Sequence, residues 1–190
     1  MEHLLGNMNV KFYPFHHYIH IYRVEGLNNW LQSEKNLLIE ESKKDKDEGV
    51  ANYFTNSELI NNDLNSLIID IALQYYHVGN KFDWMDTLPM IYHQTREEGV
   101  SVFHHHYLMS TITATTYIDP IDKEHGGGLE LFLHDTHQHI IHPEPDCIYF
   151  FPSWVFHRVL PQSIDIPRLC INWGLNCSVR PIHKLTADRW

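Results

Sequence analysis

Residues 104–120 read HHHYLMSTITATTYIDP, and this stretch decides the fold and site expected of the chain. It combines three consecutive histidines with an apolar, β-branched run that is typical of a strand. Side chains at alternate positions of a strand share a face, so His104 and His106 are expected to point together while His105 points away. A third imidazole from a distant strand, His157, would complete a three-point facial metal site with open positions opposite it.

From residue 88 onward the sequence has the residue pattern of a β-protein. Short β-rich runs alternate with turn signals that contain glycine and proline. The expected strands cover residues 89–95, 100–107, 111–118, 129–133, 138–142, 147–151, 156–160 and 168–175. Strands at this spacing predict a β-sandwich or barrel. We therefore expect a mainly β fold, a jelly roll with helices packed on one face.

The segment before this region reads as a helical flank. A strand is expected over 15–24, and leucines and a tryptophan at helical spacing predict a helix over about 27–42. A capping box at 55–58 opens a second helix with one apolar stripe, which Gly79 would cap. The interpretation is one domain over residues 1–190, with a helical flank over 1–87 and a β-helix core over 88–178.

Composition narrows the class of function. The 190 residues carry a formal net charge of −10 and no basic patch, which argues against a nucleic-acid partner. No apolar stretch is long enough for a transmembrane helix, and no signal peptide is expected at the N-terminus. Three cysteines without metal-site spacing favour a reducing, cytoplasmic location. Histidine, with 16 residues, is the outlier.

Two further side chains are candidates for an anion pocket. Alternation along the 168–175 strand places Arg168, Cys170 and Asn172 on one face, opposite a row of apolar residues. A guanidinium at the start of a core strand needs an anionic partner and can hold a carboxylate through two parallel bonds. Tyr117 would add a hydroxyl to such a pocket, although a surface ion pair for Arg168 and a core position for Tyr117 remain alternatives.

The order of the motifs resembles the 2-oxoglutarate/iron(II)-dependent oxygenase superfamily. It is closest in kind to the small, prolyl-hydroxylase-like members of bacteria and phages, and it covers about residues 90–175. The motifs are His-x-His at 104–106, Tyr-Ile-Asp-Pro at 117–120, Gly-Gly-Gly-Leu-Glu-Leu-Phe at 126–132, Phe-Phe-Pro-Ser-Trp-Val-Phe-His at 150–157 and Arg-Leu-Cys-Ile-Asn-Trp at 168–173.

The resemblance implies a double-stranded β-helix and an enzyme that uses Fe(II) as cofactor and 2-oxoglutarate as cosubstrate. His104 and His157 would be iron ligands, Arg168 would bind the distal carboxylate of 2-oxoglutarate, and Tyr117 would support it. Such a dioxygenase hydroxylates a C–H bond and releases succinate and CO2, with no catalytic side chain needed beyond the metal ligands. The substrate, a small molecule or a peptide, is not readable, and the oligomeric state stays open, a homodimer included.

Two positions depart from the superfamily pattern. His106 stands where the superfamily usually has an aspartate or glutamate, so the ligand set carries one negative charge less. Cys170 replaces the usual serine two residues after the arginine, and a thiol is a weaker hydrogen-bond partner. Both departures bear on turnover and not on the fold.

Other readings of the same residues stay open. A differently metallated cupin-like protein, such as a three-histidine thiol dioxygenase, would share the histidines, but no glutamate follows His106 at the cupin spacing. Zinc bound by His134, His137 and His139 is a second alternative, weakened by the absence of nearby cysteines. A non-catalytic jelly-roll binding protein with a decayed site is the third.

Overall fold

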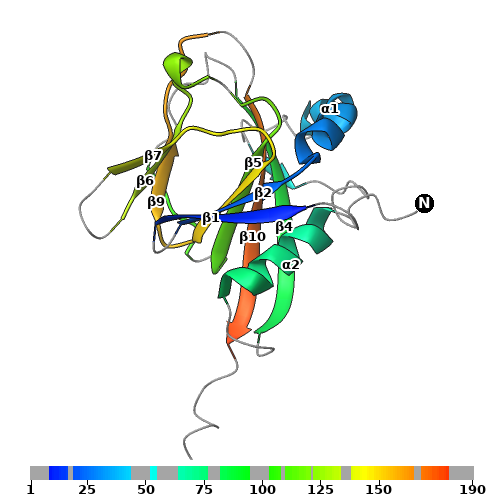
Figure 1. Ribbon diagram of the computed structural model, residues 1–190, viewed down its shortest axis with the longest axis vertical. Helices are drawn as coiled ribbons and strands as arrows, with labels where there is room; N and C mark the ends of the chain where they lie inside the picture. Colours follow the sequence, from blue (N-terminus) through cyan, green and yellow to red (C-terminus); the bar gives the residue numbers. More distant parts are fainter. Residues whose placement is uncertain are drawn as a thin grey trace, which may run out of the picture.

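The protein is described here by a computed structural model that covers residues 9–16, 19–43, 52–54, 64–76, 82–94, 103–107, 110–120, 122–133, 138–164 and 168–179. These residues form two antiparallel sheets, two α-helices and a short 3-10 helix (Figure 1). The large sheet has seven strands in the order β1-β2-β8-β5-β10-β4-β3, and the small sheet has three in the order β7-β6-β9. The expectation of a mainly β fold with helices toward the N-terminus is confirmed.

The elements are coloured along the chain from blue at the N-terminus to red at the C-terminus in Figure 1. Their bounds are β1 (Val10–His16), β2 (Ile19–Val24), α1 (Leu27–Lys43), β3 (Asn52–Phe54), α2 (Asn65–Tyr76), β4 (Phe82–Gln94), β5 (Ile112–Tyr117), η4 (Lys123–His125), β6 (Leu129–Phe132), β7 (Gln138–Ile141), β8 (Cys147–Pro152), β9 (Phe156–Val159) and β10 (Arg168–Val179).

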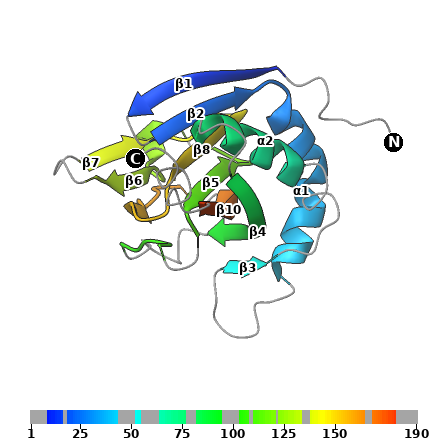
Figure 2. The same cartoon turned by 90° about the horizontal axis from the view of Figure 1, so that it is seen from below.

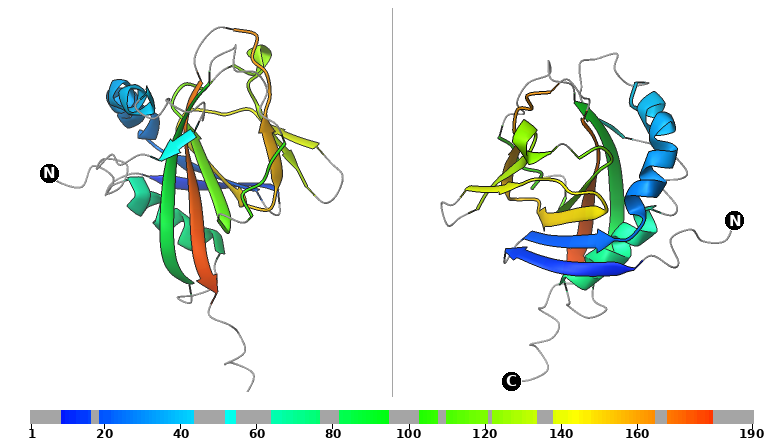
Figure 3. Two further views of the ribbon diagram at one scale, coloured as in Figure 1. Left: turned by 180° about the vertical axis from the view of Figure 1, so that it is seen from behind. Right: turned by 45° about the horizontal axis from the view of Figure 1, so that its top comes forward.

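The molecule has three layers. Figure 2 shows the small sheet on one side of the large sheet and both helices on the other, and the two views of Figure 3 agree. The helices cover the large sheet with a hydrophobic cluster, which includes Leu31 of α1, Ile68 of α2 and Ile171 of β10. Trp173 is fully buried in this layer, and its indole N–H donates to Asn65 Oδ1 at 2.8 Å. Burial of this apolar surface is the main source of stability.

A second cluster fills the space between the two sheets. It contains Tyr117, Tyr149 and Cys170 of the large sheet together with Leu129 and Leu131 of the small sheet. Successive residues of β10 alternate between the clusters, because Leu169, Ile171 and Trp173 face the helices and Cys170 faces the small sheet. The predicted alternation of this strand is confirmed.

Most predicted elements match the structure within one to a few residues. The helix expected at 27–42 is α1, and the strands expected at 111–118, 129–133, 138–142, 147–151 and 156–160 are β5 to β9. The strand expected at 15–24 is instead a pair, β1 and β2, because the chain reverses between them. The start of the second helix and its expected cap at Gly79 lie outside the described residues.

The large sheet extends further toward the N-terminus than the expected core over 88–178. Strands β1 and β2 pair onto β8, and β3 pairs onto β4. The assignment of residues 1–190 to a single domain stays a prediction. No helix within the described part of the chain is long and apolar enough to cross a membrane.

Candidate metal centre

His157 is the most firmly held of the predicted ligands. It lies in the middle of β9, opposite Leu131 of β6, and its side chain is 6% exposed. Its Nδ1 is 2.9 Å from the carbonyl oxygen of Val155, so Nδ1–H donates there and the lone pair is left on Nε2. The ring packs edge-on against Phe151 of β8. A histidine fixed in this way through its other nitrogen is arranged as metal ligands usually are.

The histidine run lies beside β9 but is not the regular strand that was expected over 100–107. Within 103–107 the only β-pairing is an isolated bridge, in which His104 N donates to His157 O at 3.1 Å and His157 N donates to His104 O at 2.9 Å. Two residues later the chain turns to another partner, because His106 N donates to Ser153 O at 2.8 Å. This change of partner breaks the ladder, so the predicted strand is wrong for residues 103–107, and residues 100–102 lie outside the described part of the chain.

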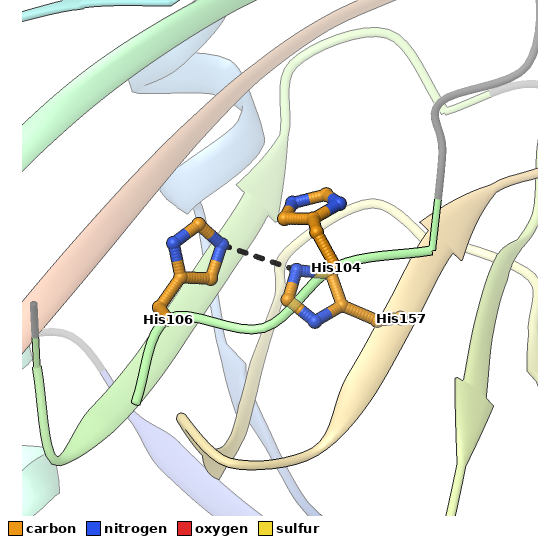
Figure 4. A group of neighbouring side chains, drawn as sticks. All are labelled: His104, His106 and His157. Carbon is orange, nitrogen blue, oxygen red and sulfur yellow. Dashed lines mark hydrogen bonds between the residues drawn. The ribbon is translucent and has the colours of Figure 1, made fainter. Parts of the chain in front are cut away.

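The three candidate imidazoles nevertheless meet at one point. One ring nitrogen from each of His104, His106 and His157 lies within 4.8 Å of the other two (Figure 4). The Nε2 atoms of His106 and His157 are 3.2 Å apart. Two nitrogens bound to one metal at about 2.1 Å lie roughly 3.0–3.4 Å apart at angles of about 90–110°. The spacing therefore fits a shared divalent ion.

Burial keeps two of these imidazoles, those of His106 and His157, neutral, as metal ligands must be. Desolvation lowers the pKa of His157 to about 3, and the neighbouring His104 and His106 lower it further, against the opposing hydrogen bond to Val155. Desolvation also lowers the pKa of His106 to about 4, followed by the charges of His104 and His105. Both rings present unprotonated nitrogens at neutral pH, so a metal meets no proton competition there.

His105 points away from this cluster. Its ring is exposed and packs edge-on against Phe156, 4.7 Å between centroids, on the outer side of β9. His157, the neighbour of Phe156, points to the inner side. The predicted division of the histidine run, with His104 and His106 on one side and His105 on the other, therefore agrees with the structure even though the strand does not form.

The two residues expected to bind a carboxylate belong to neighbouring strands of the large sheet, β5 and β10. Tyr117 ends β5, is 2% exposed and packs edge-on against Tyr149. It pairs in the sheet with Cys170, and Arg168 opens the same strand two residues earlier. The backbone thus brings the Tyr117 and Arg168 positions to neighbouring strands of one sheet, while a role for them in binding stays a prediction.

Sequence reasoning missed a group of buried hydroxyls beside the cluster. Ser153 Oγ lies 2.7 Å from Ser110 Oγ and 3.0 Å from Thr113 Oγ1. The only signal in the sequence is the Pro-Ser corner at 152–153, and serine after proline is common in turns of any kind.

The alternative zinc site was predicted at His134, His137 and His139. Of these residues, His134 and His137 lie outside the described residues.

Comparison with known proteins finds similarity at the level of structure only. No family model matches the sequence, and no curated protein matches it. Among solved structures, a prolyl-4-hydroxylase from Pseudomonas putida is similar with a TM-score of 0.60 and 17% identity, over 78% of this chain and 86% of that chain. A viral collagen prolyl hydroxylase from Paramecium Bursaria Chlorella virus-1 is similar with a TM-score of 0.59 and 14% identity, over 83% and 89% of the two chains.

A third similar structure is a prolyl 4-hydroxylase from Phytophthora capsici. Its TM-score is 0.64 at 18% identity, over 83% of this chain and 58% of that chain. At such identities the likeness shows a shared fold. The β-rich architecture of this chain is therefore that of the prolyl 4-hydroxylases, and activity has to be argued from the site itself.

Proposed function

We propose that the protein is an Fe(II)- and 2-oxoglutarate-dependent oxygenase that hydroxylates a C–H bond of a small-molecule or peptidyl substrate. The observation that carries the proposal is the convergence of three imidazoles, with 3.2 Å between the Nε2 atoms of His106 and His157. The similar folds are those of prolyl hydroxylases, and one of these was solved with 2-oxoglutarate bound. The cytoplasmic location of the protein stays a prediction.

The chain path supports a double-stranded β-helix as the framework. From β4 to β10 the chain alternates between the sheets: β4 and β5 lie in the large sheet with β8 and β10, whereas β6, β7 and β9 form the small sheet. The 103–107 segment adds a fourth position to the small sheet, beside β9. Eight segments shared between two facing sheets are the arrangement of a jelly roll.

The histidines would hold the metal in the following way. His157 offers Nε2 because its Nδ1–H is engaged by Val155 O. His106 offers the nitrogen that faces it, and His104, exposed at the rim, supplies the third position. Iron bound there together with 2-oxoglutarate would supply the oxidising chemistry, with dioxygen as the oxidant that gives one oxygen atom to the substrate and one to succinate. The protein positions the reactants and shields them, since Phe151 and Leu131 line the inner side of the site.

Arg168 and Tyr117 would bind the far carboxylate of 2-oxoglutarate. Strand alternation puts position 168 on the same face of β10 as Cys170, which pairs with Tyr117. A guanidinium and a phenol at neighbouring positions are suited to one carboxylate. In this arrangement the cosubstrate lies in the inter-sheet space between the histidines and the end of β5.

The decisive assay is succinate formation from 2-oxoglutarate by the protein loaded with Fe(II). We expect succinate from the wild-type protein, even without the primary substrate, at a low uncoupled rate. Absence of succinate from a protein that binds Fe(II) would favour the second candidate, a cupin-like metal protein of different chemistry. The observation behind that candidate is the donor set of three imidazoles with no carboxylate.

Replacing Arg168 tests the cosubstrate pocket separately. Arg168→Ala removes one partner of a charge-assisted pair and should cost about 2–5 kcal/mol of 2-oxoglutarate binding. The KM for 2-oxoglutarate should then rise by roughly 30-fold or more, while the affinity for the metal stays the same. An unchanged KM would exclude Arg168 from the pocket.

A further inference from the structure

Three buried hydroxyls form a connected group beside the candidate metal centre. Ser153 is fully buried, and Ser110 and Thr113 are 6% and 5% exposed. Ser153 Oγ lies at the centre of the group, within hydrogen-bond distance of both Ser110 Oγ and Thr113 Oγ1. We call these three residues the hydroxyl clamp.

The clamp is closed around the backbone of His106. His106 N donates to Ser153 O at 2.8 Å, and Ser110 N donates to His106 O at 2.9 Å. The side chains of the same two serines are bonded to each other at 2.7 Å. A ring of hydrogen bonds therefore runs from His106 to Ser153, on to Ser110 and back to His106. Both backbone groups of this one residue are fixed through the clamp.

The clamp is anchored to the large sheet on two sides. Thr113 belongs to β5, and Ser153 N donates to Thr111 O at 3.0 Å. On the β10 side, Ser110 lies against Gly174, where an added Cβ would be 3.1 Å from Ser110 Cβ. The close approach of the β10 backbone leaves Ser110 little room to move. The position of His106 is thus tied to β5 and β10, although its own segment is not part of a strand.

Hydroxyl groups are an expensive way to fill this space. Buried hydroxyls lose their hydration and have to be bonded within the protein, whereas apolar side chains of the same size would be cheaper. The helix-facing side of the same sheet is filled mostly in that cheaper way. The three bonded hydroxyls of the clamp lie beside His106, the one candidate ligand without a β-bridge.

We infer that the hydroxyl clamp positions His106 for metal binding and that Ser153 is its central positioning residue. The inference rests on the proposed metal site. His106 has to present its Nε2 to the same point as His157, whose ring is fixed independently by Val155. Loosening the clamp would release the His106 side of the pair and leave the His157 side in place.

The test compares the Co(II) affinity and the visible spectrum of Co(II) in two variants with those of the wild-type protein. Ser153→Ala removes the central hydroxyl and should weaken Co(II) binding about 10–100-fold, the usual effect of losing a group that orients a ligand. The ligand-field bands should shift as well, because the geometry at His106 is no longer fixed. Ser110→Ala removes only one of the two side-chain hydrogen bonds of the clamp. It should change the Co(II) affinity and the spectrum in the same direction as Ser153→Ala.

Thr116→Val is the matched control. Thr116 lies three residues after Thr113 in β5, is 1% exposed, and donates its hydroxyl to Cys147 O at 2.9 Å, away from the clamp. It loses a buried hydrogen bond of the same kind, so a general loss of stability affects it equally. We expect its Co(II) affinity to stay within twofold of the wild-type value, with an unchanged spectrum.

The outcomes separate this inference from the proposed function. Native affinity and a native spectrum in both serine variants, with a wild-type protein that binds Co(II), would overturn the clamp and leave the metal site standing. Equal losses in Ser153→Ala and Thr116→Val would overturn it as well. A wild-type protein that binds no Co(II) contradicts the metal site itself, and the clamp with it.

Discussion

The two faces of the large sheet differ in the side chains that line them. The face toward α1 and α2 is lined by apolar side chains, such as Ile112, Ile148 and Ile171. The face toward the small sheet carries hydroxyls, thiols and phenols among its apolar residues, including Thr115 and Tyr149. The same strands supply both faces through alternate residues. One side of the sheet is built for stability, and the other gives up part of that stability for polar groups that a ligand can use.

The largest expected effect on stability comes from comparing two neighbouring residues of β10, one on each face of the sheet. Ile171 is fully buried against the helices, so Ile171→Ala should lower the free energy of unfolding by about 2–5 kcal/mol. Cys170→Ala, on the inner face, removes a single heavy atom and should cost less. Urea denaturation of both variants measures the difference. A larger loss in Cys170→Ala would reverse the roles assigned to the two faces.

The buried imidazole of His157, which lies between the two sheets, should make the stability of the metal-free protein depend on pH. In the folded protein the pKa of His157 is lowered to about 3, whereas in the unfolded chain it has its ordinary value near 6.5. Between these values the unfolded state binds a proton that the folded state does not. The contribution of His157 to the free energy of unfolding is therefore complete above about pH 6.5. As the pH falls below this value, it is lost at about 1.4 kcal/mol per pH unit.

This pH effect is measured by urea denaturation with a chelator at pH 7.5 and pH 5.5. His157→Gln should lose less stability between the two pH values than the wild-type protein does, by about 1.4 kcal/mol. Other titrating groups contribute to both proteins and cancel in the difference. An equal loss in both proteins would mean that His157 is not buried as the structure has it.

The smallest predicted effect separates two threonines on the inner face of β5. Thr113 Oγ1 is bonded to Ser153, so Thr113→Val should cost about 1 kcal/mol of stability. Within the described part of the chain, Thr115 Oγ1 is buried without a hydrogen-bond partner. Thr115→Val should therefore be neutral or slightly stabilising. Thermal or urea unfolding decides, and a loss in Thr115→Val as large as that in Thr113→Val would mean that its hydroxyl is bonded.

Local patterns in the sequence predicted most of the elements of the fold. Alternation predicted which residues of β10 face the helices, and helical spacing predicted α1, because both depend on a few neighbouring residues. The reversal between β1 and β2 was missed, since Phe15–Val24 is rich in strand-forming residues throughout. Periodicity shows that residues are extended and does not show where the chain turns back.

The sequence predicted which three histidines come together but not which residues hold them in place. The spacing of His104 and His106 was enough to expect two imidazoles on one side, and the structure brings them to His157. The partners that hold them are Ser153 for His106 and Val155 for His157. Ser153 lies 47 residues from His106 in the chain, as their numbers show, and no local pattern links a carbonyl group to so distant an N–H.

Fe(II) or Co(II) titration of single alanine variants shows whether His104, His106 and His157 bind one metal ion. We expect His106→Ala and His157→Ala to lose metal affinity by at least about 100-fold, and His104→Ala to lose affinity as well. His105→Ala should bind like the wild-type protein, since its ring packs outside against Phe156. Loss of the metal in His105→Ala, with binding retained in the His104 and His106 variants, would exclude this set of ligands.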